Sequence, residues 1–130
     1  MVRRIVRTPR APNPVGPFSQ AAKAANFVFV AGQGGLDPKT NRLVKGGIKE
    51  QTKQTLENIR NILEASGANL DQVVQVRVFL KEPQDFKAMN EVYSTYFRKD
   101  HPARTTIATT FVVEGGLVEI DAIAYVEQRI

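Results

Sequence analysis

The run His101-Pro102-Ala103-Arg104 leads into a predicted strand, and Arg104 is the residue best suited to chemistry. Thr106, Ala108 and Thr110 alternate with it, so they share its side of the pleat. An arginine beside small polar residues at a strand end can hold a carboxylate through two parallel N–H···O hydrogen bonds. A structural ion pair explains Arg104 equally well from the residues alone.

Two acidic residues, Glu119 and Asp121, share one side of the last predicted strand with apolar neighbours. Acidic side chains in such surroundings need partners. Glu119 could form a salt bridge with Arg104, or it could activate water beside a bound anion. If the last two strands formed a hairpin turning near 114–115, Arg104 would lie about 20 Å from Glu119. Cooperation between them would then require non-adjacent strands or two different subunits.

Asn90 lies on the apolar side of a predicted helix, one turn before Tyr93. A buried asparagine must find hydrogen-bond partners, so Asn90 either ties down a backbone segment or faces a ligand. His101 is the single histidine and precedes a proline in a loop, where a solvated side chain is the simpler interpretation. No serine–histidine–acid set and no metal-binding set can be assembled around it.

A glycine-rich run, Gly32 to Gly35, ends a predicted strand in the way that a phosphate-binding loop would. However, Asp37-Pro38 follows, and this dipeptide does not open the helix whose N-terminus would hold the phosphate. A glycine-rich strand end and turn is therefore the better interpretation. Gly32 would still allow a ligand to approach main-chain N–H groups.

The composition limits the classes of site that the chain can build. Its 130 residues fit a single domain over 1–130. The absence of cysteine excludes disulfides, thiolate metal sites and a cysteine nucleophile. With one histidine, a zinc site would have to be built mostly from carboxylates. No apolar run approaches the ~20 residues that span a bilayer, and the N-terminus lacks the apolar stretch of a secretion signal. We therefore expect a cytoplasmic protein without a membrane partner.

The formal net charge of +5 comes from one end of the chain. Of the 18 basic residues, five lie within residues 1–23 without any acid, and the remaining 13 balance the 13 acidic residues. A nucleic-acid face usually shows basic residues recurring across the fold. The pattern therefore favours an edge strand protected by charge over a nucleic-acid partner.

Hydrophobic periodicity predicts the elements that would position these residues. We expect strands at 2–7, 26–31, 74–81, 103–111 and 117–126, helices at 48–63 and 84–98, a proline-rich loop at 8–17 and a turn at 37–41. The order predicts at least one parallel crossover, through the helix at 84–98. With both helices on one face the other sheet face would be bare, so we expect an oligomer that covers it.

Five segments of the chain are familiar when taken together and in order. They are Gly16-Pro17-Phe18-Ser19-Gln20, Val30-Ala31-Gly32-Gln33, Asp85-Phe86 with Met89-Asn90 and Tyr93, Pro102-Ala103-Arg104-Thr105-Thr106, and Val118-Glu119-Ile120-Asp121-Ala122-Ile123-Ala124. Over essentially the whole chain they resemble the Rid family, the reactive intermediate imine/enamine deaminases. That family was once catalogued as translation inhibitors of the perchloric-acid-soluble protein type.

The resemblance implies an α+β, chorismate-mutase-like fold with a mixed six-stranded sheet and two helices packed on one face. It also implies a homotrimer whose clefts between subunits take a small 2-imino or 2-keto acid. The implied reaction is hydrolytic deamination of 2-imino acids, such as those derived from 2-aminoacrylate or 2-aminocrotonate, to 2-keto acids and ammonia. No metal or cofactor is implied, because an imine is already electrophilic.

The same resemblance assigns carboxylate binding to Arg104 and the positioning of water to Glu119. The family's pocket asparagine falls on Asn90, and its ligand-facing glycine falls on Gly32. Three further pocket positions depart from the well-studied deaminases: Phe18 replaces tyrosine, Ala31 replaces serine and Thr106 replaces cysteine. The loss of two hydrogen-bonding groups, at Phe18 and Ala31, can shift substrate choice considerably.

Two other functions stay open at this point. A small-carboxylate binding or sensor protein would use the same site with little turnover. A ribonuclease or translation inhibitor, the family's older description, has less support because the chain offers one histidine and only a local basic patch.

Overall fold

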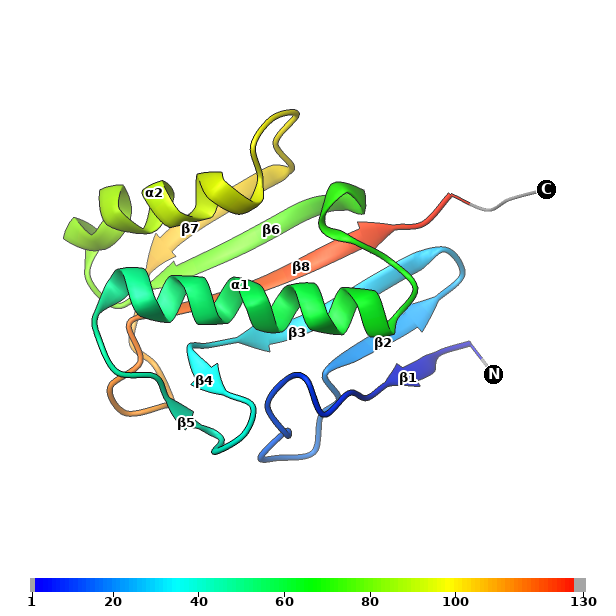
Figure 1. Cartoon of the computed structure of the whole chain (residues 1–130). Helices are drawn as coiled ribbons and strands as arrows, with labels where there is room; N and C mark the ends of the chain where they lie inside the picture. The colour runs from blue at the N-terminus through cyan, green and yellow to red at the C-terminus, as the bar shows by residue number, and fades with distance from the viewer. Residues whose placement is uncertain (1, 128–130) are drawn as a thin grey trace.

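The structure, a computed structural model, describes residues 2–127 and is organised around a six-stranded sheet with both helices on one face (Figure 1). The order of strands across the sheet is β1-β2-β3-β8-β6-β7. The strands are β1 (Arg4–Val6), β2 (Ala21–Ala24), β3 (Phe27–Gln33), β6 (Val73–Leu80), β7 (Ala103–Ala108) and β8 (Val118–Tyr125). The mixed α+β architecture that the resemblance implied is therefore present.

Helix α1 (Ile48–Ala65) confirms the helix that hydrophobic periodicity predicts at 48–63. Its apolar face is buried against the sheet, where it contacts β3 and β8. The Glu50 carboxylate accepts the Gly47 N–H at 2.8 Å and so satisfies one donor at the start of the helix. Gly67 follows the helix with φ +83°, a conformation that favours glycine at a helix end.

Helix α2 (Phe86–Tyr96) follows a short 3-10 turn, η2 (Pro83–Asp85), which begins at the predicted proline. It connects β6 to β7, and these two strands pair in parallel, which confirms the predicted crossover. The helix ends two residues earlier than predicted. Within residues 2–127, neither helix has the length and apolar character needed to cross a membrane.

Several sequence predictions need correction. The predicted strand at 103–111 ends at Ala108, and β1 covers only part of 2–7. Strand β2 was not predicted, because its alanines and lysine carry little strand preference of their own; it forms by antiparallel pairing with both β1 and β3. The predicted turn at 37–41 is present, but it joins a small separate hairpin of β4 (Leu36–Asp37) and β5 (Arg42–Leu43).

The last strand lies in the middle of the sheet. Strand β8 pairs with β3 on one side and with β6 on the other, so β6 separates it from β7. The last two strands, β7 and β8, do not pair with each other, so the hairpin considered from the sequence is absent. Strand β7 lies at the edge of the sheet instead. As a result, Arg104 and Glu119 lie on non-adjacent strands.

The sheet face opposite the helices is not covered by any other element of residues 2–127 and carries exposed aromatic side chains, in agreement with the prediction of a bare face. Phe27, Phe29 and Tyr125 are each about two-fifths exposed and contact one another, with ring centroids 5.1 Å apart for Phe27 and Tyr125. Alternate residues of the same strands, such as Val28 and Ala124, are fully buried under the helices. The sheet is thus covered on one side only within the single chain.

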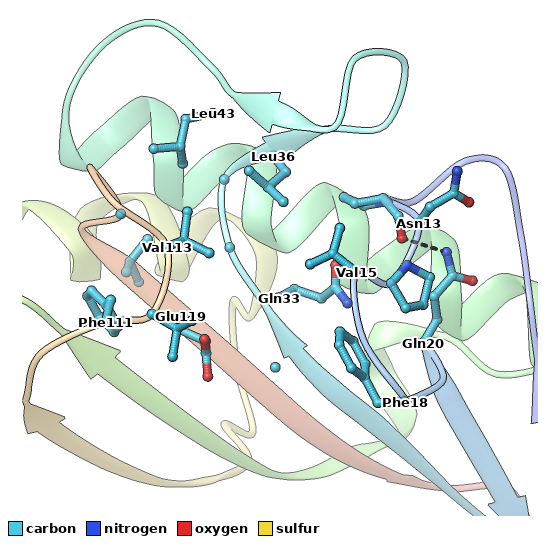
Figure 2. Close-up of a pocket in the computed structure, with 18 residues that line it drawn as sticks. Asn13, Val15, Phe18, Gln20, Gln33, Leu36, Leu43, Phe111, Val113 and Glu119 are labelled. Atoms are coloured by element: carbon cyan, nitrogen blue, oxygen red, sulfur yellow. Dashed lines mark hydrogen bonds between the residues drawn. The ribbon is translucent and has the colours of Figure 1, made fainter.

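The proline-rich loop before β2 is held by one buried side chain, Gln20 (Figure 2). Its amide nitrogen donates to the carbonyl oxygens of Thr8, Ala11 and Pro12 at 2.9–3.2 Å. Its amide oxygen accepts the Thr8 N–H at 2.8 Å. Both ends of this amide are therefore used to fix a segment that has no strand or helix of its own.

Replacing Gln20 with leucine leaves these buried loop groups without partners. We expect Gln20→Leu to lower the free energy of unfolding by about 3 kcal/mol, because each orphaned buried polar group costs about 1–3 kcal/mol. Urea unfolding at a fixed protein concentration measures the change. The matched variant Gln84→Leu, on the exposed 3-10 turn, should stay within about 0.5 kcal/mol of the parent. Equal stability of the two variants would contradict the role given to Gln20.

Candidate active site

Glu119 lies on the helix-free side of the sheet, directly over Gly32. A Cβ atom at Gly32 would stand 2.6 Å from the Glu119 Oε2 atom, so only glycine leaves room for this carboxylate. The pairing of β3 with β8 shifts register between Val30 and Gln33, which is a bulge at the position of Ala31 and Gly32. The bulge presents the Gly32 backbone to the glutamate.

A cavity of about 350 Å³ opens beside Glu119 (Figure 2). Gly32 and Phe18 line it together with residues of the proline-rich loop, of the β4–β5 hairpin and of the loop before β8. Phe18 is half-exposed and belongs to this wall. Ala31 is next to Gly32, and its N–H donates to the Gln20 carbonyl at 2.9 Å. The structure therefore gathers Phe18, Gly32 and Glu119 in the cavity wall, whereas Ala31 does not line the cavity.

The environment of Glu119 raises the pKa of its carboxyl group. Burial raises the pKa of its carboxyl group, the nearby Asp121 carboxylate raises that pKa further, and the Arg77 guanidinium lowers it. Arg77 itself is engaged by Asp121, with N–O distances of 2.7–3.1 Å. A carboxylate with a raised pKa in a cavity wall is suited to accept and return a proton.

The possible salt bridge between Glu119 and Arg104 does not form within the chain. In the part of the chain that the structure describes, Asp121 is the carboxylate on this strand that binds an arginine, and the arginine is Arg77. The reason is register, since Asp121 lies directly opposite Arg77 on the neighbouring strand β6. Glu119 lies opposite Phe79 and forms no ion pair with any residue between 2 and 127.

Arg104 lies on the other face of the sheet, against α2. Its guanidinium carbon is 4.7 Å from the centroid of the Tyr93 ring and 5.7 Å from that of Phe86, both within cation–π range. The two rings hold the cation without neutralising it, and no carboxylate among residues 2–127 forms an ion pair with it. Thr106 is half-buried on the same side of β7. A positively charged group fixed by aromatic rings is well prepared to bind an anion.

Two polar atoms of α2 are buried without a hydrogen-bond partner among residues 2–127. They are the Asn90 Oδ1 atom and the hydroxyl of Tyr93, whose ring contacts Arg104. Burial raises the pKa of Tyr93, and the charge of Arg104 opposes this shift. Native structures seldom leave such atoms unsatisfied, so a ligand or an added chain is the natural partner. Sequence reasoning missed Tyr93 as a site residue, although its i+3 spacing from Asn90 places both on one helix face.

The candidate residues thus form two separate groups in one chain. Arg104 lies opposite Val76 and Glu119 opposite Phe79 on the strand between them. Three residues along the strands and two strand spacings across them separate the Cα atoms by about 14 Å. Because the two side chains also leave opposite faces of the sheet, they cannot meet within one chain.

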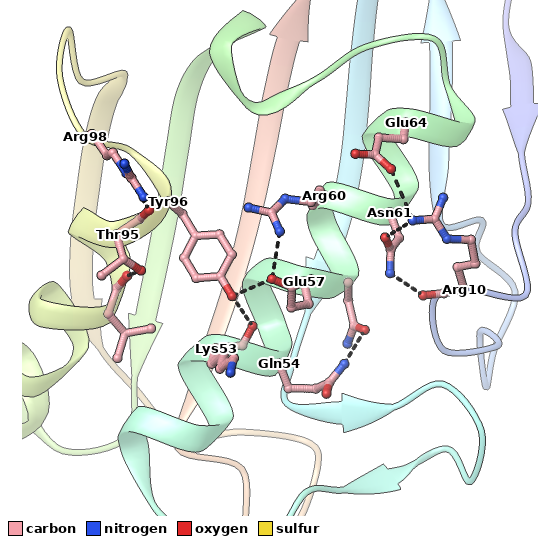
Figure 3. A network of polar contacts seen from close by, with 12 residues as sticks. Arg10, Lys53, Gln54, Glu57, Arg60, Asn61, Glu64, Thr95, Tyr96 and Arg98 are labelled. Carbon is pink, nitrogen blue, oxygen red and sulfur yellow. Dashed lines mark hydrogen bonds and ion pairs between the residues drawn. The ribbon is translucent and has the colours of Figure 1, made fainter.

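A second polar cluster lies on the outer sides of the helices (Figure 3). The Tyr96 hydroxyl donates to Glu57 at 2.6 Å, and Arg60 forms an ion pair with the same carboxylate at 2.9 Å. At the other end of α1, Arg10 contacts Asn61 and Glu64. Each of these charged groups is satisfied by its neighbours, so the cluster joins elements and leaves no group free for a ligand. Among the described residues, no three histidine or acidic side chains lie together as metal ligands.

Comparison with known proteins identifies the family of the chain. The sequence model of the family described as Endoribonuclease L-PSP matches residues 8–126. A RutC family protein of Pyrococcus abyssi is 51% identical over 127 residues, which cover 98% of this chain and all of the relative. The 2-iminobutanoate/2-iminopropanoate deaminase of Capra hircus is 44% identical over 124 residues, covering 95% of this chain and 90% of that protein.

A solved structure shows the same fold. The crystal structure of RidA from the Antarctic bacterium Psychrobacter sp. superposes with a TM-score of 0.91 at 40% identity, covering 95% of this chain and 99% of that one. The match of sequence and of fold spans both groups of candidate residues. This chain belongs to the Rid family, which is also known under the names RutC and L-PSP.

Proposed function

We propose that the chain is a hydrolytic deaminase of 2-imino acids that releases 2-keto acids and ammonia. The observation that carries the proposal is a pair of half-sites, neither of which forms an ion pair among residues 2–127: an arginine stacked on aromatic rings, and a carboxylate with a raised pKa in a cavity wall. The first suits the carboxylate of a 2-imino acid, and the second suits the water that attacks its imine carbon.

We further propose that each complete site is made by two copies of the chain in a homotrimer. Arg104 lies on the edge strand β7, so a neighbouring molecule can reach it. Glu119 faces the helix-free side, where exposed aromatic residues favour contact with another chain. A closed ring with head-to-tail interfaces would bring the arginine group of one subunit to the glutamate group of the next.

The chemistry at such a site balances without any other reactant. Arg104 and its neighbours Asn90 and Thr106 hold the substrate carboxylate. Glu119 accepts a proton from water as the water oxygen bonds to the imine carbon, and it returns that proton to the nitrogen. In the resulting carbinolamine, Glu119 takes the proton of the hydroxyl group and passes it to the amino group. The carbon–nitrogen bond then breaks, the carbonyl group forms and ammonia leaves. A carboxyl group with a raised pKa suits both the accepting and the returning step.

Loss of the arginine side chain should abolish this reaction. We expect Arg104→Ala to lower kcat/KM for 2-iminopropanoate by about 100-fold or more, because a substrate that is not held in place loses the benefit of orientation. Arg104→Lys should recover only part of the loss, since an ammonium group cannot form the bidentate contact. Decay of the imino acid, generated in place by an amino-acid oxidase, measures the rate.

The exposed Arg98 provides a matched control, and Arg98→Ala should retain the parent rate. If the wild-type protein does not accelerate the decay of the imino acid, the proposed deaminase function is wrong. Binding of a 2-keto acid without turnover of the imino acid would support the alternative, a carboxylate-binding or sensor protein. The apolar side chains of Phe18 and Ala31 are compatible with this alternative.

The raised pKa of Glu119 sets the pH dependence of the rate. Because the carboxylate form must accept the proton, kcat/KM should increase with pH through an apparent pKa above the ordinary glutamate value. Glu119→Gln should remove this acidic limb and lower the rate by about 100-fold or more. The exposed Glu114 serves as control, since Glu114→Gln should keep the limb. If the increase of kcat/KM with pH persists in Glu119→Gln, another group causes it.

Mixing two inactive variants tests the composite site. Co-expression of Arg104→Ala and Glu119→Gln subunits should restore activity, because some interfaces then join an intact Arg104 to an intact Glu119. With random assembly about one quarter of the sites are intact, so the mixture should show about one quarter of the wild-type rate. Sites contained within single subunits would leave the mixture as inactive as its parents.

A further inference from the structure

We infer that the cavity beside Glu119 takes the side chain of the substrate, and that this side chain is bulky and apolar. The inference rests on the proposed deaminase function and names the substrate class of that site. The curated relative is named for the short-chain substrates 2-iminobutanoate and 2-iminopropanoate. The cavity of this chain has room for considerably larger groups.

The wall of the cavity is predominantly apolar. Its large apolar side chains come from three segments that are distant in sequence: Val15 and Phe18, then Leu36 and Leu43, then Phe111 and Val113. Glu119 is the only ionisable residue among those that line it. The other polar side chains in the wall are the uncharged amides of Asn13, Gln20 and Gln33, and that of Gln20 is already engaged by the loop backbone. An anionic substrate side chain would therefore lose its hydration without meeting a positively charged partner.

The position of Glu119 sets the direction of the substrate. Its carboxylate lies in the wall of the cavity, and Leu36 and Leu43 lie at the opposite side (Figure 2). An imine carbon within reach of Glu119 has two remaining substituents, a carboxylate and a side chain. The carboxylate needs Arg104, which is not part of this wall, so the side chain is the substituent that enters the cavity.

The size of the cavity favours a side chain larger than methyl or ethyl. Its volume of about 350 Å³ lies within the range of ligand pockets, roughly 300–1,000 Å³. A short substrate would leave most of this apolar space empty, and each added methylene in an apolar pocket changes kcat/KM by about 10- to 200-fold. Phe18 contributes to this character, since it presents a phenyl ring without a hydroxyl group.

A comparison of substrates tests the inference with the full-length protein. An amino-acid oxidase supplies imino acids from alanine, leucine and phenylalanine, and from glutamate as the charged case. We expect kcat/KM for the leucine-derived substrate to exceed that for the alanine-derived one by about tenfold or more. The glutamate-derived substrate should be slower than the leucine-derived one.

Two variants connect this preference to the cavity. Val113→Trp should narrow the cavity and lower the leucine-to-alanine ratio of kcat/KM by about fivefold or more, and Val15→Ser should lower it by removing apolar surface. Both side chains are partly or largely exposed, at 45% and 80%, so the chain should tolerate the changes. Val2→Trp, with a parent side chain 84% exposed and outside the cavity wall, should keep the ratio.

The outcomes distinguish failure of the side-chain preference from failure of the deaminase function. Turnover of the alanine-derived substrate as fast as that of the leucine-derived one would overturn the side-chain inference and leave the deaminase intact. A leucine preference that neither cavity variant changes would also overturn it. If the wild-type protein accelerates the decay of no imino acid, the proposed function itself fails.

Discussion

The pairing of β6 between β7 and β8 is the constraint on which the rest of the molecule depends. It places Arg104 and Glu119 on non-adjacent strands and, through the register with Val76 and Phe79, on opposite faces of the sheet. Neither change of rotamer nor local flexibility can bring the two side chains together across a packed sheet. Each chain therefore carries two separate groups of candidate residues, and chemistry that used both would require a second copy.

The two groups are held in place by different interactions. On the helix side, the rings of Tyr93 and Phe86 fix a guanidinium group without neutralising it. On the other side, a strand bulge and the absence of a side chain at Gly32 make room for a carboxylate whose pKa is raised mainly by burial. Neither charged group forms an ion pair within the part of the chain that the structure describes, so both are open to a substrate or to water.

Local pattern was sufficient to predict part of this structure. The 3–4 spacing of α1, the alternation in β8 and the crossover through α2 follow from elementary periodicity, and all three are present. In β6 the predicted alternation holds from Val76 onward, whereas Val74, expected in the core, is exposed because the register shifts between Val73 and Gln75. Alternation also placed Glu119 and Asp121 on one side of their strand. Sheet order, however, depends on contacts between distant segments, so the central place of β8 and the pairing of Arg77 with Asp121 could not be predicted. Strand β2 and the contact of the Tyr93 ring with Arg104 were missed for the same reason, because both join segments that are distant in sequence.

The most direct test of the divided site is a crystal structure of the protein with a bound 2-keto acid, the product of the proposed reaction. The ligand carboxylate should contact the Arg104 guanidinium of one subunit, with the keto carbon beside Glu119 of another and the side chain in the cavity lined by Leu36 and Leu43. A ligand held by groups of one subunit alone, or bound without contact to Arg104, would contradict the divided site.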